Sequence, residues 1–240
     1  MKQEVTEKNL ILHVATKKVV TKNMDVFYNP KMKLNRDISI LLLNILKKKK
    51  MHICLPLAGT GVRALRFIQE LPKSMIENII VNDINERAQT FTKENVALNH
   101  INTSKIHLTN KDANLLLQEE KGYDYIDIDP YGSPNFLLDS AIQKKKNGGV
   151  LAVTATDTSA LAGTYPSACK RKYWATSRDI PQRHEMGLRI LLRKVQLLGM
   201  HHEKELQPLV SYHHEHYYRI FFSCTKSKEN KNRRKYQSIP

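Results

Sequence analysis

Cysteine is scarce in this 240-residue chain, and each of its three cysteines stands alone. Cys54, Cys169 and Cys224 form neither the close pairs of a metal site nor the framework of a disulfide-rich secreted domain. We therefore expect reduced thiols and no metal site.

Long apolar runs are also missing. No uninterrupted apolar stretch approaches the length that crosses a membrane, and the charged N-terminus lacks the apolar segment of a signal peptide. The sequence therefore predicts a soluble, cytoplasmic protein that does not bind membranes.

Acidic residues are outnumbered by basic ones. The chain has 23 Asp and Glu against 39 Lys and Arg, for a formal net charge of +16. Part of the excess lies in a basic tail, residues 226–240, but the rest of the chain is also basic. This balance favours a polyanionic partner such as nucleic acid. With 41% hydrophobic residues, we expect one domain over residues 1–225, followed by the tail.

Apolar, β-rich runs alternate with amphipathic stretches along most of the chain. After a small N-terminal hairpin or edge extension, this order predicts a parallel sheet wound by right-handed crossovers. An Asn-Gly-Gly turn is expected before the fifth strand of the sheet. The expected strands are 51–57, 79–83, 105–108, 123–129, 149–156, 206–212 and 216–224, and the clearest helices end near residue 50 or span 85–99 and 183–198.

The most informative stretch is residues 123–134, a strand that must stop at Asp129-Pro130-Tyr131 because proline has no N–H for the ladder. Ligands of open α/β sheets bind at the carboxyl ends of strands. The Asp129 carboxylate and the Pro130 carbonyl can accept hydrogen bonds from a planar exocyclic amine, and Tyr131 can stack on its ring. The alternative is an Asx-turn that caps the strand, with Tyr131 as rim packing.

Glycines and acids follow the earlier strands. Gly59 and Gly61 lie between a strand and a helix, where they allow a nucleotide to approach the backbone. Asp83, about twenty residues later, suits ribose hydroxyls. Asp112 can accept from an adenine amine, although an isolated Asp at this position is also typical of a helix N-cap.

Two aromatic segments leave packing and binding open. Phe27 and Tyr28 precede an Asn-Pro turn. Either ring can be a buried anchor of that turn or can form one side of a stack around a base. Residues 169–174, Cys-Lys-Arg-Lys-Tyr-Trp, are basic and aromatic, and either packing or RNA contact explains them.

Together these pieces resemble the class I S-adenosylmethionine-dependent methyltransferases, and within them the tRNA (guanine26-N2)-dimethyltransferase family. The resemblance implies a Rossmann-like α/β fold: a mostly parallel seven-stranded sheet with helices on both faces and an antiparallel last strand. The matching segments are 26–30, 34–37, 60–66, 127–134, 154–158, 184–191 and 216–219.

The resemblance also assigns roles. S-adenosylmethionine is the implied cofactor, and the residues implied to line its site are Arg36, Arg66, Asp83, Asp112 and Ala113. Asp129 is implied to accept the proton of the guanine amine, with Phe27 and Tyr131 stacked on the flipped base. Arg36 and Arg66 suit the methionine carboxylate, although either can instead form a surface ion pair.

Two departures from the family pattern stand out. Pro56 and Leu57 replace the acid that many class I methyltransferases carry after the first strand. We also expect the family's C-terminal tRNA-binding domain to be absent, which raises the alternatives of a homo-oligomer or a separate subunit. Rival functions are an N-methyltransferase for another guanine or adenine in RNA or DNA, an idle RNA-binding subunit, and a dinucleotide-dependent oxidoreductase.

Overall fold

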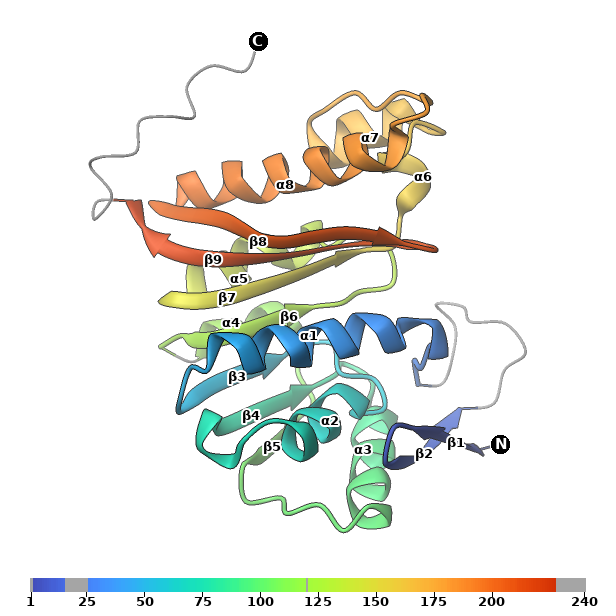
Figure 1. Cartoon of the computed structure of the whole chain (residues 1–240), viewed down its shortest axis with the longest axis vertical. Helices are drawn as coiled ribbons and strands as arrows, with labels where there is room; N and C mark the ends of the chain where they lie inside the picture. The colour runs from blue at the N-terminus through green and yellow to red at the C-terminus, as the bar shows by residue number, and fades with distance from the viewer. Residues whose placement is uncertain (1, 16–25, 120, 228–240) are drawn as a thin grey trace. The chain divides into compact units, whose positions relative to one another are not determined.

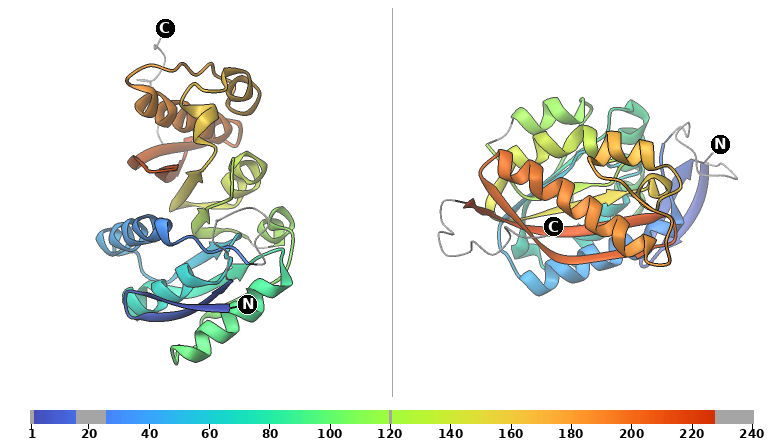
Figure 2. Two further views of the ribbon diagram at one scale, coloured as in Figure 1. Left: turned by 90° about the vertical axis from the view of Figure 1, so that its right-hand side faces the viewer. Right: turned by 90° about the horizontal axis from the view of Figure 1, so that it is seen from above.

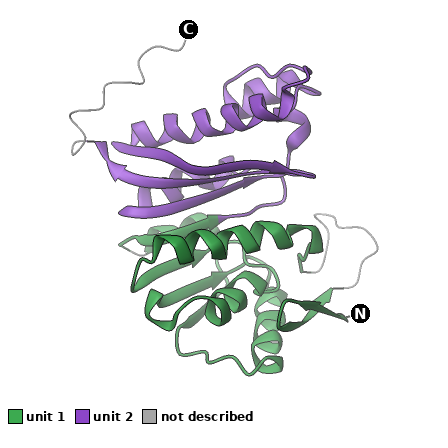
Figure 3. Ribbon diagram, in the orientation of Figure 1, with its two compact units in different colours: residues 1–127 green, residues 128–240 purple. Residues whose placement is uncertain are grey.

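The computed structural model describes residues 2–15, 26–119 and 121–227. The chain divides into two compact units, residues 1–127 and 128–240 (Figure 3). Hydrogen-bonded neighbours run β5-β4-β3-β6-β7-β9-β8 in one seven-stranded sheet, and β1 and β2 form a separate two-stranded sheet.

The first unit contains four parallel strands in the order β5-β4-β3-β6. Helices α1 and α2 lie on one face of these strands and α4 on the other (Figures 1 and 2). Its elements are β1 (Lys2–Glu7), β2 (Leu10–Ala15), α1 (Lys33–Leu46), β3 (Met51–Leu55), α2 (Val62–Glu70), β4 (Ile76–Asn82), α3 (Glu86–Leu98), β5 (Ile106–Thr109), α4 (Ala113–Glu119) and β6 (Tyr123–Ile128), with short 3-10 turns at Pro30–Met32 and Lys73–Met75.

The second unit is built on an antiparallel arrangement in which β9 lies between β7 and β8. Helix α8 packs on β8 and β9, and α5 contacts both α8 and β7. The elements are α5 (Asn135–Lys144), β7 (Lys145–Ala155), α6 (Thr158–Leu161), α7 (Pro166–Tyr173), α8 (Arg183–His201), β8 (Lys204–His214) and β9 (Tyr217–Lys226).

This topology confirms the expected seven-stranded α/β sheet whose last strand is antiparallel. Strand β6 is buried along its whole length, as a central parallel strand covered on both faces must be. The buried residues of this strand include the acids Asp124 and Asp127, which lie on opposite faces of it.

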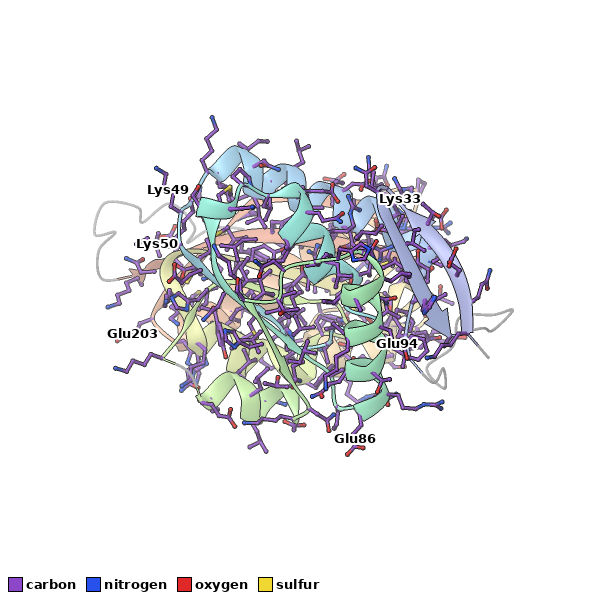
Figure 4. The ribbon with its side chains drawn as sticks, turned by 90° about the horizontal axis from the view of Figure 1, so that it is seen from below. Lys33, Lys49, Lys50, Glu86, Glu94 and Glu203 are labelled. Atoms are coloured by element: carbon purple, nitrogen blue, oxygen red, sulfur yellow. The ribbon has the colours of Figure 1, made fainter. Side chains whose placement is uncertain are left out.

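A hairpin does form near the N-terminus, but it pairs β1 with β2. The expected second piece, Val19-Val20, lies outside the described residues. Asn95 in α3 and Asn99 just after the helix hold the hairpin, through hydrogen bonds of their side-chain amides to the backbone of His13 and Ile11. Lys2 also pairs with Glu94, the α3 residue labelled beside the hairpin in Figure 4.

Two local expectations need correction. The apolar helix expected through Leu46 is confirmed, but α1 does not continue to Lys50, because Lys47 adopts the left-handed conformation (φ 49°). The Asn-Gly-Gly sequence is part of β7 instead of a turn, and the Asn147 side chain accepts a hydrogen bond from the Lys226 N–H.

Candidate cofactor and methyl-acceptor site

The carboxyl ends of β3, β4, β5 and β6 meet at one edge of the first unit because these strands are parallel. The side chain of Asn82 ties three of those ends together. Its amide donates to the carbonyls of Pro56 (3.0 Å) and Lys111 (2.9 Å), and its oxygen accepts from the Thr109 hydroxyl and the Lys111 N–H. Sequence reasoning missed this residue, whose only signal is an amide at the end of an apolar strand.

Other atoms of the protein pack closely against both glycines of the loop. Gly59 has φ 55°, and a Cβ there would lie 2.4 Å from the backbone carbonyl oxygen of Phe27. Gly61 has φ 76°, and a Cβ there would meet the side chain of Thr92 at 2.6 Å. The structure therefore brings Phe27 against the glycine loop, and the absence of side chains is what permits this approach.

Asp83 meets the same loop. Its Oδ2 accepts a hydrogen bond from the Gly59 N–H at 2.8 Å, and its Oδ1 accepts from the Asn85 N–H at 3.0 Å. A carboxylate has about four acceptor sites, so capacity for two hydroxyl donors remains. The expected proximity of Asp83 and the glycine loop is confirmed.

Asp112 is a helix N-cap, which was one of the two readings of its sequence. Its Oδ1 accepts from the N–H groups of Asn114 (2.8 Å) and Leu115 (3.2 Å), at the start of α4. Ala113, the first residue of α4, is buried. Asp112 itself is exposed.

Arg36 and Arg66 lie in a buried ion network. Both guanidiniums bond the carboxylate of Glu7, which is 2% exposed, and Arg66 also pairs with Asp37 (2.6 Å) and Glu70 (2.6 Å). Each arginine is thus an ion pair, as the alternative reading had it, but in the interior rather than on the surface. The network fixes the hairpin strand β1 to α1 and α2.

The network also sets the protonation of its acids. Burial alone would raise the pKa of Glu7, but the hydrogen bonds and charges of Arg36 and Arg66 outweigh burial and lower it. The pKa of Asp37 is lowered in the same way by Arg66 and Lys33 against the opposing effect of burial. Sequence reasoning missed Glu7, which stands in a charged strand that reads as exposed.

In the second unit, the chain leaves β6 through Asp129-Pro130-Tyr131. Asp129 is half-buried, Pro130 is buried, and Tyr131 is 57% exposed. Burial and the neighbouring Tyr212 raise the pKa of Tyr217 on β9, and the negative charge of Asp129 contributes to the same shift. Asp129 therefore lies within electrostatic reach of β9.

The loop after Tyr131 is clasped to the end of β7. The Gly132 N–H donates to the Thr156 hydroxyl (2.6 Å), and the Thr156 N–H donates to the Gly132 carbonyl (2.9 Å). Helix α7 adds a second anchor: the Tyr173 hydroxyl donates to Asp157 (2.6 Å) and lies 3.1 Å from the Ser133 hydroxyl. Burial, followed by the charge of Asp157, raises the pKa of Tyr173, which keeps it a donor.

Two classes of feature are not found in the described part of the chain. Residues 2–15, 26–119 and 121–227 contain no group of three or more His, Cys, Asp or Glu side chains placed to hold a metal ion. Their helices include none that is both long enough and apolar enough to cross a membrane.

Known proteins resemble this chain over most of its length. The family model described as "N2,N2-dimethylguanosine tRNA methyltransferase" matches residues 5–239. The Aquifex aeolicus tRNA (guanine(26)-N(2)/guanine(27)-N(2))-dimethyltransferase is 40% identical over 210 residues, which cover 85% of this chain and 53% of that protein. The Saccharolobus solfataricus tRNA (guanine(26)-N(2))-dimethyltransferase is 43% identical over 196 residues, covering 82% and 50%.

The solved structures agree with these relatives. Trm1 from Pyrococcus horikoshii, solved as a complex with S-adenosyl-L-methionine, superposes with a TM-score of 0.85 at 34% identity, covering 95% of this chain and 62% of that one. Trm5b from Pyrococcus abyssi, with a TM-score of 0.60 at 16% identity, shares the fold. The chain spans about half the length of the curated relatives it matches.

Proposed function

Because the chain belongs to the N2,N2-dimethylguanosine tRNA methyltransferase family, we propose that it transfers methyl groups from S-adenosylmethionine to the N2 amine of guanine 26 in tRNA. The products are N2-methylguanosine and N2,N2-dimethylguanosine. The observation that carries the proposal is the family match over residues 5–239, which includes the Asp129-Pro130-Tyr131 segment.

The residues at the sheet edge of the first unit fit the cofactor. Gly59 and Gly61 form a tight loop, and Asp83, bonded to that loop, keeps acceptor capacity for ribose hydroxyls. Asp112 and Ala113 open α4 and are proposed to address adenine, through the second Asp112 oxygen and the Ala113 N–H. S-adenosylmethionine, when bound, supplies an electrophilic methyl group on a sulfonium.

For Arg36 and Arg66, the buried ion pairs support a positioning role. Both charges are already matched by carboxylates, and the Arg36 guanidinium also reaches the Asn29 carbonyl, two residues after Phe27. Their contribution to the cofactor site then comes through the segments they fix. Direct contact of either guanidinium with the methionine carboxylate stays a prediction.

The acceptor chemistry is assigned to the segment after β6. We propose that guanine 26 is extruded from the tRNA and that Phe27 and Tyr131 stack on its faces. The Asp129 carboxylate and the Pro130 carbonyl accept the N–H groups of the amine and so orient its lone pair toward the methyl carbon. S-adenosylmethionine, when bound, would supply the methyl group to that lone pair and would keep the electron pair of the broken C–S bond. Asp129 takes the amine proton and passes it to solvent.

The test is nucleoside analysis of unmodified tRNA after reaction with this chain and labelled cofactor. N2-methylated guanosine is the expected product, and methylation of another base, or only of rRNA or DNA, would overturn the proposal. Since one relative is named for positions 26 and 27, transcripts with guanine at only one of these positions identify the target.

Asp129→Asn tests the proposed acceptor role, because the amide keeps the shape but turns one oxygen into a donor. We expect at least about a hundredfold loss of turnover, the scale of a lost general base, with cofactor affinity unchanged. Asp139→Asn is the matched control, since Asp139 is exposed and pairs only at the surface with His202. Near-normal turnover of Asp129→Asn would remove Asp129 from the mechanism.

The same preparation tests whether the chain acts with a partner. If it forms a homo-oligomer, light scattering should report a mass of more than one copy. If it needs a separate subunit, added cell extract should raise its activity. Activity of a monomeric chain alone would contradict both. A cytoplasmic location stays a prediction that follows from a tRNA substrate.

A further inference from the structure

Lys194 is a buried lysine without an anionic partner. It lies on the inward stripe of α8 with Gly187, Ile190, Leu191 and Val195, and is only 5% exposed. Within residues 2–15, 26–119 and 121–227, its ammonium forms no ion pair or hydrogen bond, and it lies 2.8 Å from the centroid of the Trp174 ring. A charge buried in this way is costly unless something compensates it. A lysine at this buried position therefore indicates a functional role rather than a contribution to stability.

Trp174 is placed in the opposite way, with most of its surface in solvent. It is 59% exposed, and it ends α7 in the left-handed conformation (φ 59°), which is uncommon for a bulky residue. The turn before it carries Lys170, Arg171 and Lys172. One face of the indole lies over the Lys194 ammonium, and the rest of the ring is available to a ligand.

The position of Trp174 is fixed relative to the loop proposed for the target base. Its neighbour Tyr173 lies at hydrogen-bond distance from Ser133, and the Asn135 amide donates to the Lys172 carbonyl at 2.7 Å. Both contacts link the end of α7 to the segment that follows Tyr131. Figure 1 shows α7 alongside α8 in the same unit.

We propose that Trp174 and Lys194 form a nucleotide-binding subsite for the RNA substrate, separate from the pocket of the methylated guanine. A base of the RNA stacks on the exposed face of Trp174, and the charge of the Lys194 ammonium behind the ring attracts the adjacent phosphate. Aromatic rings beside cationic groups are how proteins hold unpaired nucleotides without reading sequence. The subsite rests on the proposed RNA substrate, and it accounts for both the uncompensated charge and the exposed indole.

The experiment measures equilibrium binding of unmodified tRNA at several salt concentrations, with no cofactor present. Trp174→Ala should weaken binding about tenfold, as loss of a base-stacking ring does, while Trp174→Phe retains most of the affinity. Lys194→Met should lower the slope of log affinity against log salt by about one, the signature of one lost phosphate contact. Arg189→Met is the matched control on the same helix, because Arg189 is exposed and already paired with Glu185.

A thermal melt separates this role from a structural one. Removing an uncompensated buried charge should raise the melting temperature of Lys194→Met while its RNA affinity falls. A lower melting temperature with unchanged RNA affinity would show that Lys194 is structural and would overturn the subsite. Unchanged affinity of Trp174→Ala would overturn it as well.

These outcomes are distinct from failure of the proposed function. A wild-type chain that binds tRNA with the expected variant effects but methylates nothing would overturn the methyltransferase proposal and support the subsite. Methylation that proceeds with no change in RNA affinity in either variant would do the reverse. A wild-type chain that binds no tRNA would overturn both.

Discussion

The Oδ2 atom of Asp83 accepts a hydrogen bond from the backbone N–H of Gly59 at 2.8 Å. This bond joins the end of β4 to the loop after β3, so one carboxylate both shapes the glycine loop and presents acceptors beside it. The effects of a substitution at Asp83 should therefore extend beyond a lost ligand contact.

Asp83→Ala should weaken S-adenosylmethionine binding and lower stability. The Gly59 and Asn85 N–H groups lose their acceptor, and for the buried Gly59 donor this costs about 1–3 kcal/mol. Calorimetry with S-adenosylmethionine and a denaturant melt measure the two effects, and Asp139→Asn serves as the control. Wild-type cofactor affinity in Asp83→Ala would remove Asp83 from the cofactor site.

Glu7→Gln should be strongly destabilising although it changes only one atom. It leaves the buried guanidiniums of Arg36 and Arg66 without their shared counter-charge, a loss of about 3–5 kcal/mol. Urea unfolding gives the change in the free energy of unfolding. Glu4→Gln is the control on the same strand, because Glu4 is exposed. Equal stability of the two variants would contradict the buried network.

The same network should make the chain sensitive to acid. The folded-state pKa values of Glu7 and Asp37 lie below their ordinary values of 4.5 and 3.8, so both stabilise the fold above those values. That contribution is lost as the pH falls through the lower, folded-state values. Melting temperatures should therefore drop in that range, and the gap between wild type and Glu7→Gln should narrow. A gap that is constant between pH 7 and pH 3 would contradict the shift.

Gly59→Ala should destabilise more than its backbone strain explains. Gly59 and Gly148 both have positive φ, 55° and 69°, but a Cβ at Gly148 meets nothing within 4 Å. Gly148→Ala should cost about 1–2 kcal/mol for the left-handed backbone alone. Gly59→Ala should cost about 1–3 kcal/mol more, because its Cβ overlaps the Phe27 carbonyl. Urea unfolding measures the loss of unfolding free energy in both variants. Equal losses would show that the Phe27 segment moves away from the added Cβ without an energetic cost.

Much of the fold followed from sequence because its signals are local. Apolar β-rich runs, the glycines before α2 and the proline after β6 each specify an element without help from distant residues. Sequence reasoning also placed Gly59 and Asp83 together, because carboxyl ends of parallel strands share an edge.

Residues that act through long-range pairing were missed. Glu7 reads as one acid in a charged strand, and only the folded chain brings it to Arg36 and Arg66, which lie 29 and 59 residues away. Asp127 is similar: its buried carboxylate pairs with Arg63 and accepts from the Tyr125 hydroxyl. No rule of sequence spacing links such partners. The ion pairs that the sequence allowed at the surface for Arg36 and Arg66 are therefore found in the interior.

The position of β9 has a consequence for how the protein is made. β7 and β8 are synthesised before β9, yet β9 lies between them and pairs with both. The four parallel strands of the first unit have all their partners within that unit as soon as β6 has left the ribosome. Completion of the second unit must instead wait until the last strand emerges, so a ribosome that stalls shortly before β9 would hold a nascent chain with two unmatched strand edges.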